Sequence, residues 1–232
     1  MNDRLSSVLY GTKGDQSYYS PTDTYSIAQY AYTQLDKAGV AESLKILCAD
    51  LLRYGSAAQI FKSYRTDALA DSALTESQKA YLSNAEDIFF GNTNTVLNDL
   101  SNPVIRWAGK ALELNSKVTL KFVFDVGSYA GSTDALELKV TYKDYAGQIQ
   151  TKYLSGAEAY GDIPGHYAFS FDGLLAAELR SVVSVQVCEG TNPLSCTLQY
   201  SADTYGNGKT GTLLTLCKAL FAYSDSAKAY FR

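Results

Sequence analysis

The sequence predicts an α+β fold in which an antiparallel immunoglobulin- or fibronectin-like β-sandwich is flanked by helical units. Two observations lead to this prediction: an apolar pattern typical of a helix occurs near both ends of the chain, and the hydrophobic period changes to two from Val104 onward. We therefore expect four regions, namely a β-hairpin remnant of a preceding module (1–25), a helix-turn-helix unit (26–100), the sandwich (104–200) and a C-terminal unit with a single long helix (201–232).

The helical pattern is a duplicated segment. The spacing Leu-x-x-Leu-Cys-x-x-Leu-x-x-Tyr-x-x-x-Ala begins at Leu44 and, with identical intervals, again at Leu213. A Tyr-Ser-x-x-x-Tyr motif precedes each copy, starting at Tyr25 and at Tyr200, and a predicted hairpin precedes each motif. Internal self-similarity of this kind indicates a modular array. It does not by itself indicate a ligand or a reaction.

The N-terminal elements follow from local signals. Short apolar runs at Val8–Tyr10 and Tyr18–Tyr19 flank a glycine-rich turn and predict two strands. Ser26 and Gln29 have the spacing of a capping box, so a helix is expected from there. We expect that helix over 27–38, ended by Gly39, then a helix over 41–63 and a shorter one opened by Thr75 and Gln78.

Both copies of the apolar stripe change from leucine to small residues towards their C-terminal ends. Gly55 and Ala58 stand there in the first copy, and Ser224 and Ala227 in the second. Small residues let another backbone approach closely, so each helix is expected to cross a neighbour near Gly55 and near Ser224. If that neighbour is the other copy, the two helices form a pseudo-symmetric pair.

From Val104 onward, the sequence predicts short strands in which polar and apolar residues alternate. About seven strands separated by turns are typical of an antiparallel sandwich. The expected strands are Val104–Trp107 with Ala111–Leu114, Val118–Asp125, Leu136–Tyr142, Gln148–Leu154, Tyr167–Phe171, Val182–Cys188 and Thr197–Tyr200. The preceding residues, 84–103, are polar and asparagine-rich, and we expect a linker there.

Charge and composition limit the kinds of molecule that the chain is expected to bind. The net charge is −4 with no basic run, which argues against nucleic acid, and no stretch approaches the length of a membrane span. Tyrosine is abundant, at 19 residues against one tryptophan and one histidine. Tyrosine suits a binding surface because it combines apolar area with a hydroxyl, but it is equally favoured on sheet faces.

No motif predicts catalysis, a cofactor or a metal site. Asp203–Thr210 ends in Gly-Lys-Thr like a phosphate-binding loop, but Asp203 replaces the first glycine and the flanking sheet is expected to be antiparallel. The same stretch lacks the oxygen ligand at the third position and the glutamate at the twelfth position of a calcium loop. His166 has no matching nucleophile motif. We therefore expect a protein that is not an enzyme.

The four cysteines leave alternatives open. Cys188 and Cys196 flank a predicted turn, where they are placed to face each other across a hairpin. Cys48 and Cys217 lie on the apolar stripes of the two copies, where buried free thiols are expected. The sequence does not decide whether either pair is disulfide-bonded.

Several motifs together resemble a known repeated module. Leu51–Gln59, after the Tyr25–Tyr30 motif, is similar to a module of large secreted cell-surface proteins of gut Firmicutes, and Tyr167–Leu179 and Leu216–Phe231 resemble further parts of it. The second copy departs from the usual Tyr-Gly by having Ser224 after its tyrosine. The resemblance implies an extracellular module beside adhesin-like or wall-attached regions, and it supplies no catalytic residues.

These observations favour a non-catalytic extracellular module of a bacterial surface protein that binds a host or matrix macromolecule such as a glycoprotein, mucin or immunoglobulin. The candidate binding residues are the tyrosines expected in exposed loops and strand edges, Tyr129, Tyr145, Tyr153 and Tyr160. One alternative is a carbohydrate-binding accessory module of a polysaccharide-degrading enzyme, which predicts a planar row of aromatic rings. Another is a structural spacer, which predicts neither a pocket nor an exposed aromatic cluster.

Overall fold

The computed structural model describes residues 5–7, 10–13, 16–19, 23–115 and 117–232, with side chains from Ser26 onward. The chain divides into two compact units. One, here called the helical body, comprises residues up to Ala85 together with Thr210–Ser226; the other, the β-body, comprises Glu86–Lys209 and Ala227–Arg232. Helices and antiparallel sheets together give the predicted α+β class.

The helices of the helical body begin where the sequence signals predict. The Ser26 side chain accepts the Gln29 N–H at the start of α1, and Thr75 and Gln78 cap each other at the start of α3. Gly39, with a φ of 75°, lies between α1 and α2, in the left-handed region that favours glycine. The helices span Ile27–Asp36 (α1), Glu42–Phe61 (α2), Glu76–Lys79 (α3) and Gly211–Phe231 (α4).

The apolar faces of α1 and α2 pack against each other and against the loop that follows α2. Burying these aliphatic side chains is the main favourable contribution to this part of the fold. The buried members of the cluster are Ala28, Ala31, Leu35, Cys48, Ala49, Leu52, Ala70 and Leu74.

The buried side chain of Gln59 contributes three of the hydrogen bonds that hold the loop after α2. Its Nε2 donates to the carbonyls of Arg65 and Ala68, at 3.2 and 3.0 Å, and its Oε1 accepts the N–H of Ala70 at 2.8 Å. Three backbone groups are thereby satisfied inside the body, where an unpaired polar group is costly.

The two copies of the repeat meet at equivalent residues. The rings of Tyr54 in α2 and Tyr223 in α4 stack with centroids 5.8 Å apart and an interplanar angle of 2°. Gly55 and Ser224, the small residues next to these tyrosines, are both buried. This is the contact expected for a pseudo-symmetric pair of helices.

The N-terminal strands pair in two antiparallel ladders. β1 (Leu5–Ser7) pairs with β4 (Asp23–Tyr25), and β2 (Tyr10–Lys13) pairs with β3 (Gln16–Tyr19). The expected strand at 8–10 lies outside the described residues apart from Tyr10, which belongs to β2, whereas Tyr18–Tyr19 lies in β3.

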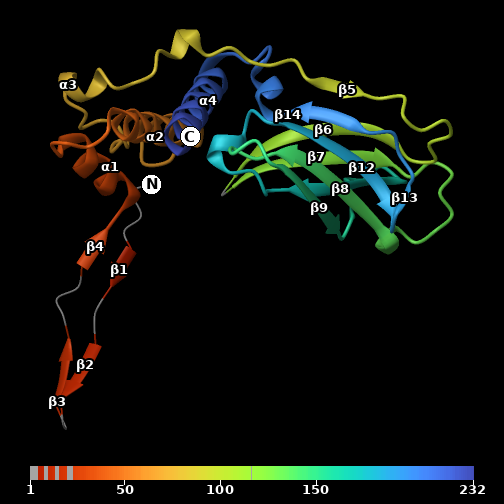
Figure 1. Cartoon of the computed structure of the whole chain (residues 1–232), viewed down its shortest axis with the longest axis horizontal. Coiled ribbons are helices and arrows are strands. Elements are labelled where there is room, and N and C mark those ends of the chain that lie inside the picture. Colours follow the sequence, from red (N-terminus) through yellow and green to blue (C-terminus); the bar gives the residue numbers. More distant parts are fainter. Residues whose placement is uncertain (1–4, 8–9, 14–15, 20–22, 116) are drawn as a thin grey trace. The chain divides into compact units, whose positions relative to one another are not determined.

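The β-body consists of two antiparallel sheets, whose strands can be followed in Figure 1. Sheet 1 has the order β10-β11-β7-β6, with the strands Glu158–Ala159, His166–Phe171, Val118–Asp125 and Arg106–Leu114. Sheet 2 has the order β5-β14-β12-β8-β9, with the strands Asn94–Val96, Leu198–Ser201, Val182–Glu189, Leu136–Lys143 and Ile149–Ser155. A short strand, β13 (Asn192–Pro193), also pairs with β12.

Aromatic side chains join the inner faces of the two sheets. The ring of Phe122 in sheet 1 meets that of Tyr200 in sheet 2 edge-on, with centroids 6.3 Å apart. Farther along, Tyr142 of sheet 2 meets Phe171 of sheet 1 at 5.8 Å. The two sheets therefore pack face to face around a shared hydrophobic core.

The segment expected to be a linker is part of the β-body. β5 pairs with β14, and just before it the N–H of Gly91 donates to the carboxylate of Asp203 at 3.1 Å. The same carboxylate accepts from the guanidinium of Arg180 at 3.1 Å and from the hydroxyl of Ser201. A Cβ at Gly91 would lie 2.8 Å from the nearer Asp203 oxygen, so this close approach requires glycine. The hydrophobic pattern did not predict this strand because β5 is short and polar.

Candidate functional site

The outer face of sheet 2 presents a row of polar side chains. Successive residues of a strand point to opposite faces, so Val140, Val183 and Val185 enter the core while their neighbours face outward. In the ladder, Ser184 of β12 is paired with Thr141 of β8 and with Gln199 of β14. Hydroxyl and amide groups from strands distant in the sequence are therefore placed side by side on this face.

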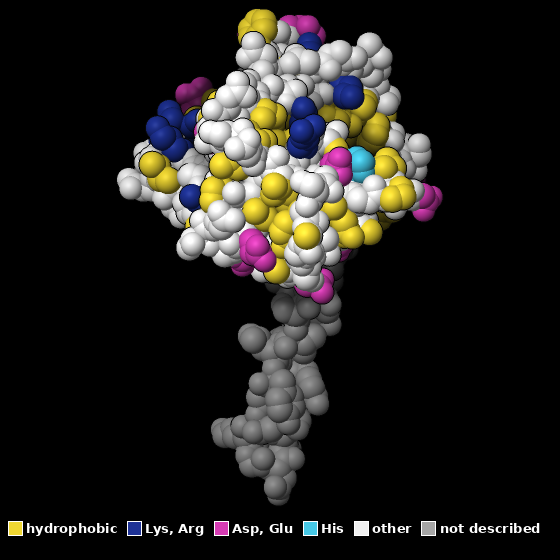
Figure 2. Space-filling view, turned by 90° about the vertical axis from the view of Figure 1, so that its right-hand side faces the viewer, with side chains coloured by type: hydrophobic (Ala, Val, Ile, Leu, Met, Phe, Trp, Pro, Cys, Tyr) yellow, Lys and Arg dark blue, Asp and Glu magenta, His cyan; other side chains and the backbone are white. Residues whose placement is uncertain are grey.

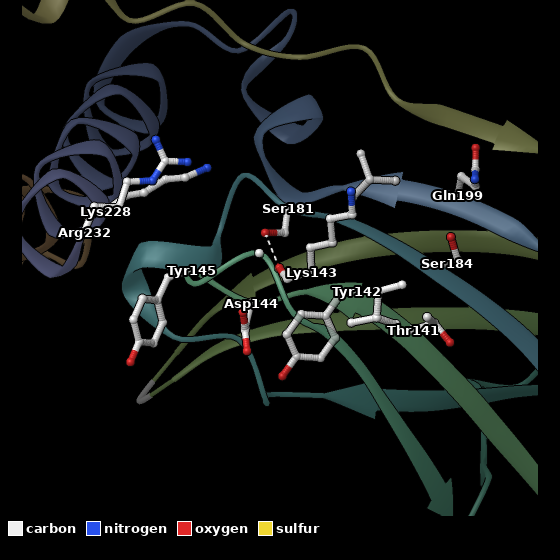
Figure 3. A pocket seen from close by; sticks show the side chains of 13 residues that line it. Thr141, Tyr142, Lys143, Asp144, Tyr145, Ser181, Ser184, Gln199, Lys228 and Arg232 are labelled. Atoms are coloured by element: carbon white, nitrogen blue, oxygen red, sulfur yellow. Dashed lines mark hydrogen bonds between the residues drawn. The ribbon is translucent and has the colours of Figure 1, made fainter.

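One end of this face is hollowed into a groove of about 530 Å³, shown in Figure 3. Thr141, Ser184 and Gln199 line it from the sheet, and Ser181 lines it from the start of β12. The Ser181 hydroxyl donates to the backbone carbonyl of Lys143 at 2.8 Å, which leaves its lone pairs free to accept. The groove can thus exchange several hydrogen bonds with a polar ligand.

Three cationic side chains also line the groove. Lys143 stands at the end of β8, Lys228 lies in the last turn of α4, and Arg232 directly follows that helix (Figure 3). Over the described part of the chain, none of the three pairs with a carboxylate. They are therefore available to a ligand.

The one carboxylate in the groove is already engaged. Oδ1 of Asp144 accepts the N–H of Gln148 at 2.8 Å, and Oδ2 accepts Nε2 of Gln150 at 2.7 Å. Asp144 thus closes the turn between β8 and β9. It keeps its negative charge, but the three cations outnumber it among the side chains that line the groove, which therefore carry an excess of positive charge.

Exposed aromatic rings lie at the margin of the groove. The Tyr145 and Phe231 ring centroids are 6.1 Å apart at 51°, and those of Phe231 and Tyr230 are 5.0 Å apart at 73°. Their exposed fractions are 37% for Tyr145, 38% for Tyr230 and 57% for Phe231. We call these three residues the aromatic rim. Tyr145 is anchored through its N–H, which donates to the buried carboxylate of Glu178 at 3.3 Å.

A smaller hollow of about 80 Å³ continues the groove along the same face. It shares Thr141 and Ser184 with the main groove and adds Lys139 and Gln186. Tyr153, which is 55% exposed, is paired with Lys139 in the ladder of β8 and β9. The candidate surface thus extends from the aromatic rim towards Tyr153.

The structure brings together only part of the predicted tyrosine set. Tyr145 and Tyr153 both belong to the hairpin of β8 and β9, whereas Tyr160 follows β10 of sheet 1, where its N–H donates to the His166 carbonyl at 2.9 Å. Tyr129 precedes β8 and Tyr145 follows it, so the strand separates them by roughly 25 Å at about 3.3 Å per residue. Tyr129 and Tyr160 therefore do not share the groove.

Sequence reasoning missed the residues that α4 contributes. Lys228, Tyr230, Phe231 and Arg232 sit at the end of a helix whose sequence pattern indicated only helix packing. No local motif links them to the hairpin of β8 and β9. Only the folded chain shows that they line or border the same groove.

The loop that resembles a phosphate-binding motif has a structural role. The Asp203 carboxylate is enclosed by its hydrogen-bond donors, and Nζ of Lys209 lies 4.4 Å from the centroid of the Tyr205 ring. Within the described ranges, no group of three or more metal-ligating side chains lies together. The residues of this loop are thus committed to internal contacts.

The single histidine lies beside a separate shallow hollow. Nδ1 of His166 is 3.3 Å from the Pro164 carbonyl, and the loop before it lines a hollow of about 260 Å³. Figure 2 shows the face on which the histidine is visible, with hydrophobic, basic and acidic side chains interspersed. This arrangement supplies no directed set of groups for a reaction.

All four cysteines are free thiols. Burial raises the pKa of Cys48 to about 11, and burial also raises the pKa of Cys188. Because the thiolate is the reactive form, both side chains are poor nucleophiles at neutral pH. Cys188 and Cys196 donate to separate carbonyls, those of Gln186 and Leu100.

The chain matches no protein-family model, no curated protein and no solved structure. The resemblance to the Firmicutes surface module thus stays a prediction from sequence motifs. Among the described helices, none has both the length and the apolar character that crossing a membrane requires. The function must be argued from the groove itself.

Proposed function

We propose that the chain is a non-catalytic, extracellular binding module of a bacterial surface protein, which holds a host or matrix macromolecule on the outer face of sheet 2. The observation that carries the proposal is the groove with its unpaired cations and its exposed aromatic rim. Exposed aromatic area next to adaptable polar groups is the composition that binding surfaces use. The extracellular location rests on the motif resemblance alone.

Within this proposal the β-body is an immunoglobulin- or fibronectin-like domain. The order β6-β7-β11-β10 in sheet 1 corresponds to strands A, B, E and D of such domains. The order β9-β8-β12-β14 in sheet 2 corresponds to C′, C, F and G. The groove then lies on the C–F–G sheet, on the face turned away from the core.

The groove also favours this proposal over the two alternatives, a structural spacer and a carbohydrate-binding module. A pure spacer needs neither a pocket nor clustered exposed rings, and both are present on this face. A module for flat polysaccharide chains needs coplanar rings, but the rings of the rim are inclined at 51° and 73°. Binding of a macromolecule through a local, three-dimensional feature accounts for the geometry better.

A capture experiment tests the proposal. The immobilised chain would be exposed to host serum and to intestinal mucus, and bound material would be compared between the wild type and a Tyr145→Ala/Phe231→Ala variant. Tyr160→Ala is the matched control, since Tyr160 is 39% exposed but belongs to the other sheet. We expect a glycoprotein that is enriched by the wild type and the control and lost with the rim variant. Failure to enrich any partner, or enrichment that survives the rim variant, would contradict the proposal.

A further inference from the structure

We infer that the groove binds a terminal sugar carrying an acid group, either a carboxylate or a sulfate, at the end of a glycan. The inference rests on the proposed binding function and specifies the chemistry that the groove would recognise. It depends on three properties of the described residues: the charge of the groove, its hydrogen-bonding groups and the inclination of its rings.

The charge of the groove favours an anion. Lys228 lies in the last turn of α4 and Arg232 directly follows the helix, and with Lys143 they provide three cations around one concavity, none of them paired with a carboxylate among the described residues. The negative end of a helix is equivalent to only about half an elementary charge, so it balances part of one cation. Arginine binds carboxylate and sulfate oxygens with two parallel hydrogen bonds, which gives a directed contact.

The remaining groups of the groove suit a sugar. Thr141, Ser184 and Gln199 offer hydroxyl and amide groups that both donate to and accept from sugar hydroxyls. The Ser181 hydroxyl, whose proton is donated to the Lys143 carbonyl, can accept from a sugar hydroxyl. Tyr145 adds an exposed apolar ring face, against which the C–H groups of a sugar ring can pack. A simple inorganic anion would use only the cations and leave these groups without a role.

The shape of the groove suits the end of a glycan better than its middle. A volume of about 530 Å³ lies within the range of about 300–1,000 Å³ that small-molecule sites occupy. The rings of the rim are inclined to one another and offer no flat surface for a long chain. One or two sugar rings at a chain terminus fit these dimensions.

An acidic peptide is a poorer fit at this position. An extended peptide at the groove would add to the edge strand of sheet 2 that borders it, which is β9. Lys152 of β9 turns inward instead, with Nζ 5.7 Å from the centroids of the Tyr142 and Phe171 rings. An inward-pointing lysine on an edge strand opposes pairing with a further strand.

The test measures binding of the whole chain to three related probes, 3′-sialyllactose, lactose 3′-sulfate and lactose, by titration calorimetry. We expect one or both acidic probes to bind at least about tenfold more tightly than lactose, because charge-assisted hydrogen bonds are added. Comparing the two acidic probes identifies which acid group is preferred. Raising the salt concentration should reduce the difference from lactose, since the cations are partly exposed.

Single variants locate the site. Lys228→Gln and Arg232→Gln should each lower the affinity for the acidic probe by about tenfold and leave lactose binding unchanged. Lys110→Gln is the matched control, because it removes the same charge from an exposed position on β6 of sheet 1. A thermal melt of each variant confirms that the fold is retained.

The outcomes separate this inference from the proposed function. Equal affinity for lactose and the acidic probes, or equal binding of a polyglutamate peptide, would overturn the acidic-sugar inference. Capture of a glycoprotein without binding of any probe would overturn it too, while leaving the proposed function intact. If the acidic probes bind but Lys228→Gln and Arg232→Gln have no more effect than Lys110→Gln, the groove is not the site.

Discussion

The two copies of the repeat are alike where their helices pack and differ in the last turn of each helix. Both have tyrosine followed by a small residue and then alanine, at Tyr54 and at Tyr223, and these two rings stack. After that the copies diverge. Gln59 is buried and holds the loop behind α2, whereas the equivalent Lys228 lines the groove of the β-body. The duplicated residues therefore account for helix packing, and the equivalent residues that follow them have different surroundings in the two copies.

The largest expected effect tests the shared part. Gly55→Leu should lower the free energy of unfolding by up to about 3 kcal/mol, because the larger side chain overpacks a buried position beside the Tyr54–Tyr223 stack. Thermal unfolding followed by circular dichroism would show a midpoint lower by several degrees.

Two further variants sharpen that measurement. Ser224→Leu should have a similar effect, since Ser224 occupies the equivalent buried position in α4. Ile60→Leu is the control, because Ile60 is on the same helix as Gly55 but is 42% exposed. A Gly55→Leu protein that melts like the wild type would show that no helix crosses α2 at that point.

A prediction of intermediate size concerns the stability effects of substituting Gln59 and Lys228, the equivalent residues at which the two copies differ. Gln59→Ala leaves two carbonyls and one N–H without their partner and should cost about 1–2 kcal/mol. Lys228→Ala, at the equivalent position, should change stability by no more than about 0.5 kcal/mol. Urea unfolding measures both. Equal destabilisation by the two substitutions would mean that Lys228 has a structural role like that of Gln59.

An effect confined to alkaline pH, and absent at neutral pH, concerns the buried thiol of the first copy. Burial raises the pKa of Cys48 from its usual value of 9.0 to about 11, so the folded protein holds this proton more tightly than the unfolded chain. The resulting stability is fully present below about pH 9 and is lost as the pH rises to about 11. Urea midpoints measured across this range should fall less in Cys48→Ala than in the wild type, and parallel curves would contradict the prediction.

Much of the fold was predictable because hydrophobic periodicity reports directly on burial. The expected strand at Val118–Asp125 is β7 without change, and α1 and α2 lie within the expected helices. The two strands expected at Val104–Trp107 and Ala111–Leu114 are instead one strand, β6. The ladder shifts register between Trp107 and Gly109, so a bulge absorbs the break that the alternation suggested.

The candidate site was less predictable because its parts are far apart in the sequence. Tyr145 and Tyr153 were found from their position in a strand hairpin. Lys228 and Arg232 carry no such signal, since the helix dipole alone favours cations near the C-terminal end of a helix. Only the structure shows that these two residues line the same groove as the hairpin of β8 and β9.

The hydrogen bonds around Asp203 set a limit on how the chain can be dissected. A fragment trimmed to Val104, where the strand periodicity begins, would lack Gly91 and β5. Asp203 would lose a backbone donor, and β14 would become an unprotected edge open to pairing with other chains. Proteases should accordingly spare the polar stretch before Val104. An excised β-body should aggregate less if it retains residues from Glu86 onward.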